Sequence, residues 1–154
     1  FAGSFGLETV ALRYFNVFGP RQSPESDYAA AIPRFVTRLL AGEKPIVYGD
    51  GEQTRSFCYV DDLVDGLIRL MESDGDVTGP INLGNPGEFS IKQLAEKVVA
   101  LVGSGSKLIY KPLPQDDPTQ RQPDITQAKA VLGWEPQIKL DQGLPKTVEY
   151  FQNL

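Results

Sequence analysis

The chain contains no histidine, a single cysteine and no long hydrophobic run, and each shortage excludes a class of function. Without histidine there is no Ser-His-Asp or Cys-His catalysis and no histidine-ligated zinc. Cys58 alone forms neither an internal disulfide nor a cysteine-built metal cluster. No stretch approaches about 18 consecutive apolar residues, and the first residues carry no basic region, so we expect no membrane span and no signal peptide. We therefore expect a cytoplasmic, reduced protein without a bound metal.

The charge and composition narrow the choice of partner. The 154 residues include 15 basic and 20 acidic side chains, for a net charge of −5, which argues against nucleic acid as the partner. A hydrophobic fraction of 41% and a charged fraction of 23% are typical of one soluble globular domain with its own core. These values favour a protein that handles small molecules.

Periodic segments separated by glycine and proline predict an α/β layered architecture. Residues 9–17 are rich in β-branched and aromatic residues and predict a buried strand. Asp61, Asp124 and Asp141 are predicted helix caps, and Ser90 with Gln93 predicts a capping box. Further strands are expected at 45–48, 55–60, 80–83 and 107–110, and helices at 32–42, 61–71, 90–103, 124–133 and 141–151. In the 61–71 helix, the expected apolar positions are Leu63, Val64, Leu67, Ile68 and Met71.

Three polar side chains stand where a ligand would bind. Asn16 lies near the end of the first strand, where ligands of open α/β sheets sit, although asparagine also suits a turn. Arg55 follows a Gly-Asp-Gly turn and has the geometry for phosphate or carboxylate, or for a surface ion pair. Arg121 lies in the irregular segment 111–123, either as part of a mobile arm that closes on an anion or as a solvated charge.

Other features have a structural interpretation or are missing. The adjacent Asp116 and Asp117 lack the facing geometry of an acid–base couple, and Trp134 and Tyr150 are expected to pack in the core or between helices. The sequence contains no glycine-rich phosphate loop and no Tyr-x-x-x-Lys pair. It also opens on Phe1 without methionine, so we expect a piece of a longer polypeptide. The residues by themselves thus indicate anion-binding arginines without self-contained catalytic machinery.

Four motifs resemble one family over nearly the whole chain. They are LRYFNVFGPRQ (12–22), VYGDGEQTRSFCYVDDL (47–63), INLGNPGEFS (81–90) and DDPTQRQPDITQAKAVLGWEP (116–136). Their order and spacing resemble the carboxyl-terminal half of extended short-chain dehydrogenases/reductases acting on nucleotide sugars, the NAD-dependent epimerase/dehydratase group. The combination of GDG-x-QTRSF, NLGNP and DDP-x-x-R-x-PDI is most similar to the UDP-glucuronate decarboxylases within it.

The resemblance implies a fold and a binding site. The fold would be the last strands of a Rossmann-like sheet (about 1–20 and 60–85) plus a small α/β substrate-binding subdomain (about 21–59 and 86–154). Asn16 and Arg55 would contact the diphosphate of a UDP-sugar. Arg121 would contact the diphosphate or assist near the reacting carbon. The implied substrate-binding set is Asn16, Arg21, Val47, Tyr48, Arg55 and Arg121, with the segment at 47 and 48 along the uracil.

The resemblance also implies a reaction. In the family a bound NAD oxidises the sugar C4 hydroxyl to a ketone, the C6 carboxylate is lost as CO₂, and hydride return yields UDP-xylose. The family's nucleotide loop and Tyr-x-x-x-Lys pair match nothing in these residues, so we expect UDP-sugar binding without turnover. A 4,6-dehydratase, a 4-epimerase and a free-standing binding or assembly module are the alternatives. An uncovered edge on the first strand predicts a homodimer or strand-exchanged oligomer.

Overall fold

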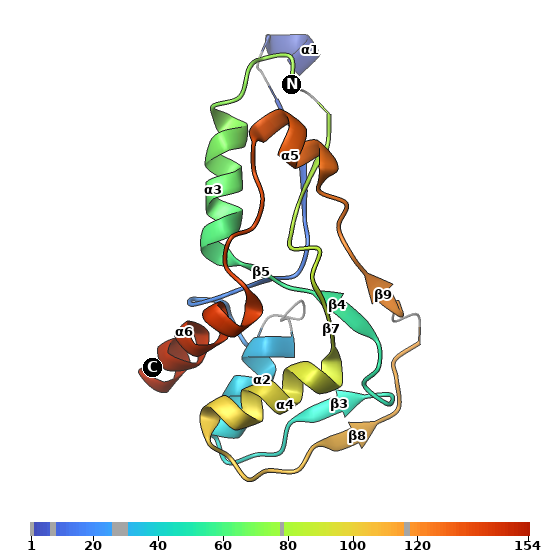
Figure 1. The fold of residues 1–154 in the computed structure, drawn as a ribbon, viewed down its shortest axis with the longest axis vertical. Helices are drawn as coiled ribbons and strands as arrows, with labels where there is room; N and C mark the ends of the chain where they lie inside the picture. Colours follow the sequence, from blue (N-terminus) through green and yellow to red (C-terminus); the bar gives the residue numbers. More distant parts are fainter. Residues whose placement is uncertain (1, 7–8, 26–30, 78, 116–117) are drawn as a thin grey trace.

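The computed structural model describes residues 2–6, 9–25, 31–77, 79–115 and 118–154, and Asp116 and Asp117 lie outside this part of the chain. Helices and strands alternate along the sequence (Figure 1), which confirms the α/β prediction. The helices are α1 (Ala2–Phe5), α2 (Ala31–Leu40), α3 (Val60–Met71), α4 (Ile91–Val102), α5 (Thr126–Leu132) and α6 (Leu140–Gln152). The strands are β1 (Leu12–Tyr14), β2 (Val17–Phe18), β3 (Ile46–Tyr48), β4 (Thr54–Ser56), β5 (Cys58–Tyr59), β6 (Ile81–Leu83), β7 (Glu88–Ser90), β8 (Ile109–Lys111) and β9 (Gln120–Arg121).

Among the described residues, the strands form four small sheets dominated by parallel pairs. β1 pairs with β6, β2 with β5, and β3 with β8, each in parallel. The fourth sheet has the order β7-β4-β9, with β4 antiparallel to β7 and parallel to β9. This central strand therefore brings together two segments that are distant from each other in the sequence.

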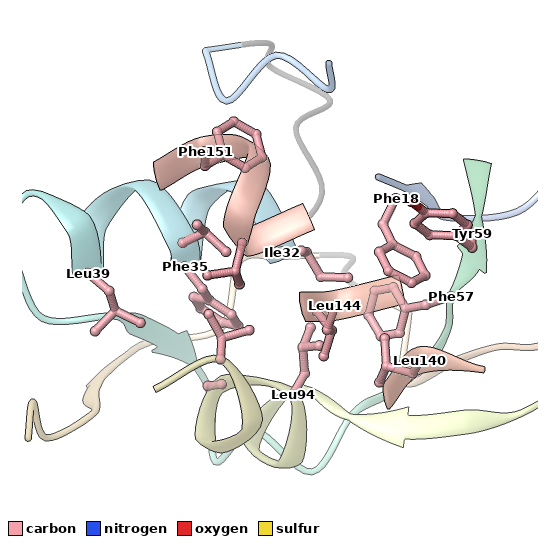
Figure 2. Close-up of a cluster of buried hydrophobic side chains, with 14 of the residues drawn as sticks. Phe18, Ile32, Phe35, Leu39, Phe57, Tyr59, Leu94, Leu140, Leu144 and Phe151 are labelled. Atoms are coloured by element: carbon pink, nitrogen blue, oxygen red, sulfur yellow. The ribbon is translucent and has the colours of Figure 1, made fainter. Parts of the chain in front are cut away.

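The larger core lies among α2, α4 and α6 and the strands beside them. Figure 2 shows Phe35, Leu94 and Leu144 pointing toward one another from these three helices. Phe18 packs edge-on against Phe57 and Tyr59, with ring centroids 6.4 and 5.4 Å apart. Burial of this apolar surface is the main stabilising contribution to the lower half of the molecule in Figure 1.

A second core lies between α3, α5 and β6. Trp134 is 1% exposed there, which confirms its predicted role, and Tyr150 packs edge-on against Phe151 on α6. The segment 125–134 thus packs with β6 and α3, although the resemblance groups it with the substrate subdomain. The proposed division into two subdomains stays a prediction.

Local capping signals are confirmed in part. Ser90 and Gln93 form the expected capping box at the start of α4, and Gly103 ends the helix in the left-handed conformation. Asp124 accepts the backbone N–H of Thr126 at 2.9 Å, just before α5. The predicted caps at Asp61 and Asp141 are wrong, because both residues lie inside the first turn of their helices.

The first strand is shorter and more exposed than expected. Instead of one buried strand over 9–17, β1 and β2 are separated by Asn16, whose φ of 25° interrupts the extended backbone. Within the described residues β1 pairs only with β6, so Arg13 and Tyr14 remain exposed. The second edge of β1 is thus unpaired within the described chain, and oligomerisation through it stays a prediction.

The core-facing side of α3 also differs from the expectation. Its buried positions are Asp62, Gly66 and Leu70, whereas Ile68 and Met71 are 49% and 82% exposed. The reason is the close approach at Gly66, where an added Cβ would lie 2.8 Å from the Leu83 side chain and 3.0 Å from that of Trp134. The tryptophan ring needs a helix surface without a side chain, so the small residue faces inward.

Asp62 fastens the segment after α5 to α3. Its carboxylate accepts the backbone N–H of Gln137 at 3.1 Å and of Ile138 at 2.9 Å. The indole Nε1–H of Trp134 donates to the Asp62 backbone oxygen at 2.9 Å. These bonds satisfy polar groups that the packing of α3 against the 134–138 segment removes from water.

We expect Asp62→Ala to lower the free energy of unfolding by about 2 kcal/mol, because two backbone N–H groups lose their acceptor. Urea denaturation measures this value. Asp65→Ala is the matched control on the same helix, since Asp65 forms an exposed ion pair with Arg69 and should lose at most about 1 kcal/mol. Equal losses in the two variants would show that the buried carboxylate has no special role.

Candidate functional site

The two arginines predicted to converge on an anion are register partners on neighbouring strands. Arg55 of β4 lies opposite Arg121 of β9 in the parallel pair. Residues paired in this way project from the same face of a sheet, because side chains alternate along both strands in step. The structure therefore brings both guanidinium groups to one face, although 66 positions separate them in the sequence.

Arg55 lies in a buried position. Its side chain is 9% exposed, and Nη1 donates to the backbone oxygen of Thr54 at 2.7 Å. A guanidinium keeps its charge under all physiological conditions, and burial reduces the screening of that charge by water. Arg121, on the edge strand, is exposed. The pair thus combines a preorganised charge with an accessible one.

Arg55 also lines a cavity of about 560 Å³ between α2, β3 and the start of α4. Tyr48, one of the predicted binding residues, lies on its wall and is 40% exposed. Gln53 lies on the same wall and donates its Nε2–H to the Tyr48 backbone oxygen at 2.9 Å. The size and the mixture of aromatic, aliphatic and polar lining are those of a small-molecule site.

Two arginines of α2, which the sequence argument did not select, complete the positive lining. Arg34 and Arg38 are one helical turn apart and both contribute to the cavity wall. Arg38 is oriented by an ion pair with Glu43 at 2.8 Å and by donation to the Lys44 backbone oxygen. Among the described lining residues there is no aspartate or glutamate. The i, i+4 spacing was the available signal, but only the fold shows which way this helix face points.

Asn16 lies at the carboxyl end of β1, beside two other segments. Its backbone oxygen accepts the Cys58 N–H at 3.1 Å, next to the strand that carries Arg55. Within the described part of the chain, the buried Asn16 Nδ2 has no hydrogen-bond partner. An added Cβ at Gly84 would lie 3.0 Å from Phe15 and 2.9 Å from Pro123, so the end of β6 and the segment after Arg121 also meet here. The amide is a donor available to a ligand.

The remaining predicted site residues are placed differently. Val47 is fully buried in the larger core, so only its backbone is available to a ligand. Arg21 is exposed and adopts a left-handed φ of 66°. Arg21, Asn16 and Arg121 are absent from the described lining of the cavity, which is bordered by Tyr48, Gln53 and Arg55 instead. The binding roles of all six residues stay predictions.

The single thiol is unsuited to nucleophilic chemistry. Burial first, and then the Asp62 carboxylate, raise the pKa of Cys58 to about 12. Within the described residues no group of three or more Cys, Asp or Glu side chains is arranged to hold a metal ion. The same part of the chain contains no helix with the length and hydropathy needed to cross a bilayer. Arginine, amide and tyrosine side chains are among the polar groups that the described residues place around the cavity.

The parallel strand pairs and the helices packed on them define an α/β protein, and arginines line its cavity. The model of the NAD dependent epimerase/dehydratase family matches residues 1–84. UDP-glucuronic acid decarboxylase 5 of Arabidopsis thaliana is 50% identical over 147 residues, which are 96% of this chain and 42% of the relative. The corresponding values for UDP-glucuronic acid decarboxylase 1 of Xenopus tropicalis are 48%, 96% and 34%. The chain belongs to the NAD-dependent epimerase/dehydratase family.

Solved structures show the same arrangement. A UDP-glucose 4-epimerase of Thermotoga maritima, solved with UDP-glucose, superimposes with a TM-score of 0.91 at 38% identity and covers 99% of this chain. A UDP-glucuronic acid 4-epimerase of Bacillus cereus, solved with UDP-glucuronic acid and NAD, gives 0.89 at 29% identity over 99% of this chain. This chain covers 48% of each of these two proteins, and so spans less than half their length.

We expect the native Cys58 thiol to resist a thiol reagent at pH 8 and to react rapidly once urea unfolds the chain. The Cys58 pKa of about 12 in the folded chain leaves almost no thiolate at that pH. An unfolded cysteine, with a pKa of about 8.5, ionises readily. The pKa of Cys58 is higher in the folded chain than in the unfolded chain. The free energy of unfolding should therefore also fall as the pH rises above about 8.5, where the unfolded thiol loses its proton first. Fast labelling without denaturant would contradict the burial of this side chain.

Proposed function

We propose that these residues form the UDP-sugar-binding part of an NAD-dependent UDP-glucuronate decarboxylase, which converts UDP-glucuronate to UDP-xylose and CO₂. The observation that supports this most directly is the register pairing of Arg55 with Arg121 beside a cavity lined by further arginines. The similarity to decarboxylases, at 50% and 48% identity, favours this substrate over the other sugars of the family.

The electrostatics suit such a ligand. A UDP-glucuronate carries about three negative charges, and planar guanidinium groups match phosphate and carboxylate oxygens in a bidentate manner. The protein as a whole has a net charge of −5, yet three of its arginines, Arg34, Arg38 and Arg55, line this one cavity. In the proposal Arg55 and Arg121 bind the diphosphate, Asn16 donates to it, and Tyr48 lies along the base. A further role of Arg121 near the reacting carbon stays a prediction.

The residues present do not fit a complete NAD site. The 154 residues contain no G-x-x-G-x-x-G loop and no Tyr-x-x-x-Lys pair. When bound, NAD would supply the oxidation of the sugar and the later return of hydride. We assign no residue of this chain to that cofactor and propose that these residues bind and orient the nucleotide sugar without turning it over.

A nucleotide-sugar 4-epimerase is the second candidate. Its support is the 38% identity to the Thermotoga maritima epimerase over almost the whole chain. In our proposal the same arginines would bind the diphosphate in both candidates, which would then differ in the sugar and in the reaction. Product analysis with UDP-glucuronate and UDP-glucose, in a polypeptide that also contains the nucleotide loop, distinguishes them.

We expect Arg55→Ala to weaken UDP binding by about tenfold or more, because a charge-assisted phosphate contact contributes about 1.5–3 kcal/mol. Isothermal titration calorimetry of the full chain with UDP at low salt measures the loss. Arg13→Ala is the control, since this exposed arginine lies on β1, outside the described lining of the cavity, and removes the same charge. If both variants bind UDP equally well, or the unaltered chain binds none, the proposed site is wrong.

We further expect no CO₂ release when the purified chain is incubated with NAD⁺ and UDP-glucuronate, because the groups that transfer hydride and protons in the family are absent from these residues. Trapping of CO₂ from a C6-labelled substrate gives the rate, with a protein-free sample as the control. Release at an enzyme-like rate would show that the chain contains a complete active site.

A further inference from the structure

The strand that carries Arg121 is attached to the rest of the molecule by a small set of contacts. β9 contains two residues and lies at the edge of its sheet, where β4 is its only strand partner among the described residues. The backbone contributes a bond from the Thr54 N–H to the Thr119 oxygen at 3.0 Å. So short a strand is not stable by itself, and side-chain contacts add to its pairing with β4.

Those contacts come from the first residue of β7 and from the turn before it. The Glu88 carboxylate accepts the Thr54 hydroxyl at 2.7 Å and the Gln120 Nε2–H at 2.9 and 3.0 Å. Two residues further along, Gln122 donates to the Pro86 backbone oxygen at 2.9 Å. Glu88 lies on the far side of β4 from β9, so its carboxylate joins all three strands of the sheet.

The alternation of a strand explains the Gln-Arg-Gln sequence. Because successive side chains point to opposite faces, Gln120 reaches Glu88 and Gln122 reaches Pro86, while Arg121 is left on the face of its register partner, Arg55. A carboxylate suits the position of Glu88 because it only accepts, and can take the Thr54 hydroxyl and the Gln120 amide at the same time.

We infer that Glu88 is a positioning residue for anion binding: by fastening β9 to β4 and β7, its carboxylate holds Arg121 beside Arg55. This inference rests on the proposed function, since it assigns to Glu88 the geometry of the diphosphate site. The expected effect of Glu88 on anion affinity has the opposite sign to that of simple charge repulsion. A carboxylate near an anion site should weaken anion binding by simple repulsion, whereas a positioning carboxylate strengthens it.

The test is UDP titration by calorimetry with the full chain and its variants. We expect Glu88→Ala to bind UDP about five-fold more weakly, because Arg121 is no longer held beside Arg55. This is a loss of about 1 kcal/mol in binding free energy. Glu88→Gln keeps a carbonyl acceptor and should restore most of the affinity. Glu96→Ala removes the same charge from an exposed position on α4 and should have no effect. In the double variant with Arg121→Ala, loss of Glu88 should add nothing.

Two results would overturn the inference. The first is UDP binding by Glu88→Ala that equals or exceeds that of the unaltered chain, and the second is full additivity with Arg121→Ala. Amide hydrogen exchange without ligand provides an independent measurement: the Thr54 N–H, bonded to Thr119, should exchange faster in Glu88→Ala than in Glu96→Ala. If the unaltered chain binds no UDP, the proposed function fails. In that case, equal exchange rates of the Thr54 N–H in Glu88→Ala and Glu96→Ala would separately reject the positioning role.

Discussion

The pairing of β4 with strands on both of its sides is the constraint on which the candidate site depends. The three residues of β4, Thr54 to Ser56, pair on one side with β7, which leads into α4, and on the other side with β9, from the late irregular segment. Each strand is too short to persist alone, so the three stabilise one another. Arg55 occupies the middle of this sheet, and its burial there gives it a fixed direction.

Helix α2 contributes both to the larger core and to the wall of the cavity. The apolar face of α2 buries Ile32, Phe35 and Val36 in the larger core, while Arg34 and Arg38 on its other side line the cavity. Packing of the helix therefore also determines the position of two positive charges. The arginines of the cavity are thus carried by an element that burial of apolar surface has already ordered.

The family relationship has a physical counterpart in this structure. A TM-score of 0.91 over 99% of the chain means that these residues adopt the arrangement seen in a little under half of the epimerase of Thermotoga maritima. This chain nevertheless forms two clusters of buried apolar residues by itself, one around α2, α4 and α6 and the other around Trp134. The exposed side of α3 and the unpaired edge of β1, among the described residues, are the parts of the fold with the least internal cover.

Local chemistry made parts of this protein predictable from the sequence alone. The capping box at Ser90 and the helices α2, α4 and α6 depend on neighbours within a few residues, and all were predicted. The four motifs likewise identified the family. Tertiary structure alone decided which face of α3 is buried, because Trp134 meets Gly66 from a distant segment. It also decided that Arg55 and Arg121 share a face and that Arg34 and Arg38 join Arg55 in one cavity, since strand register and helix orientation arise only when distant segments pack together.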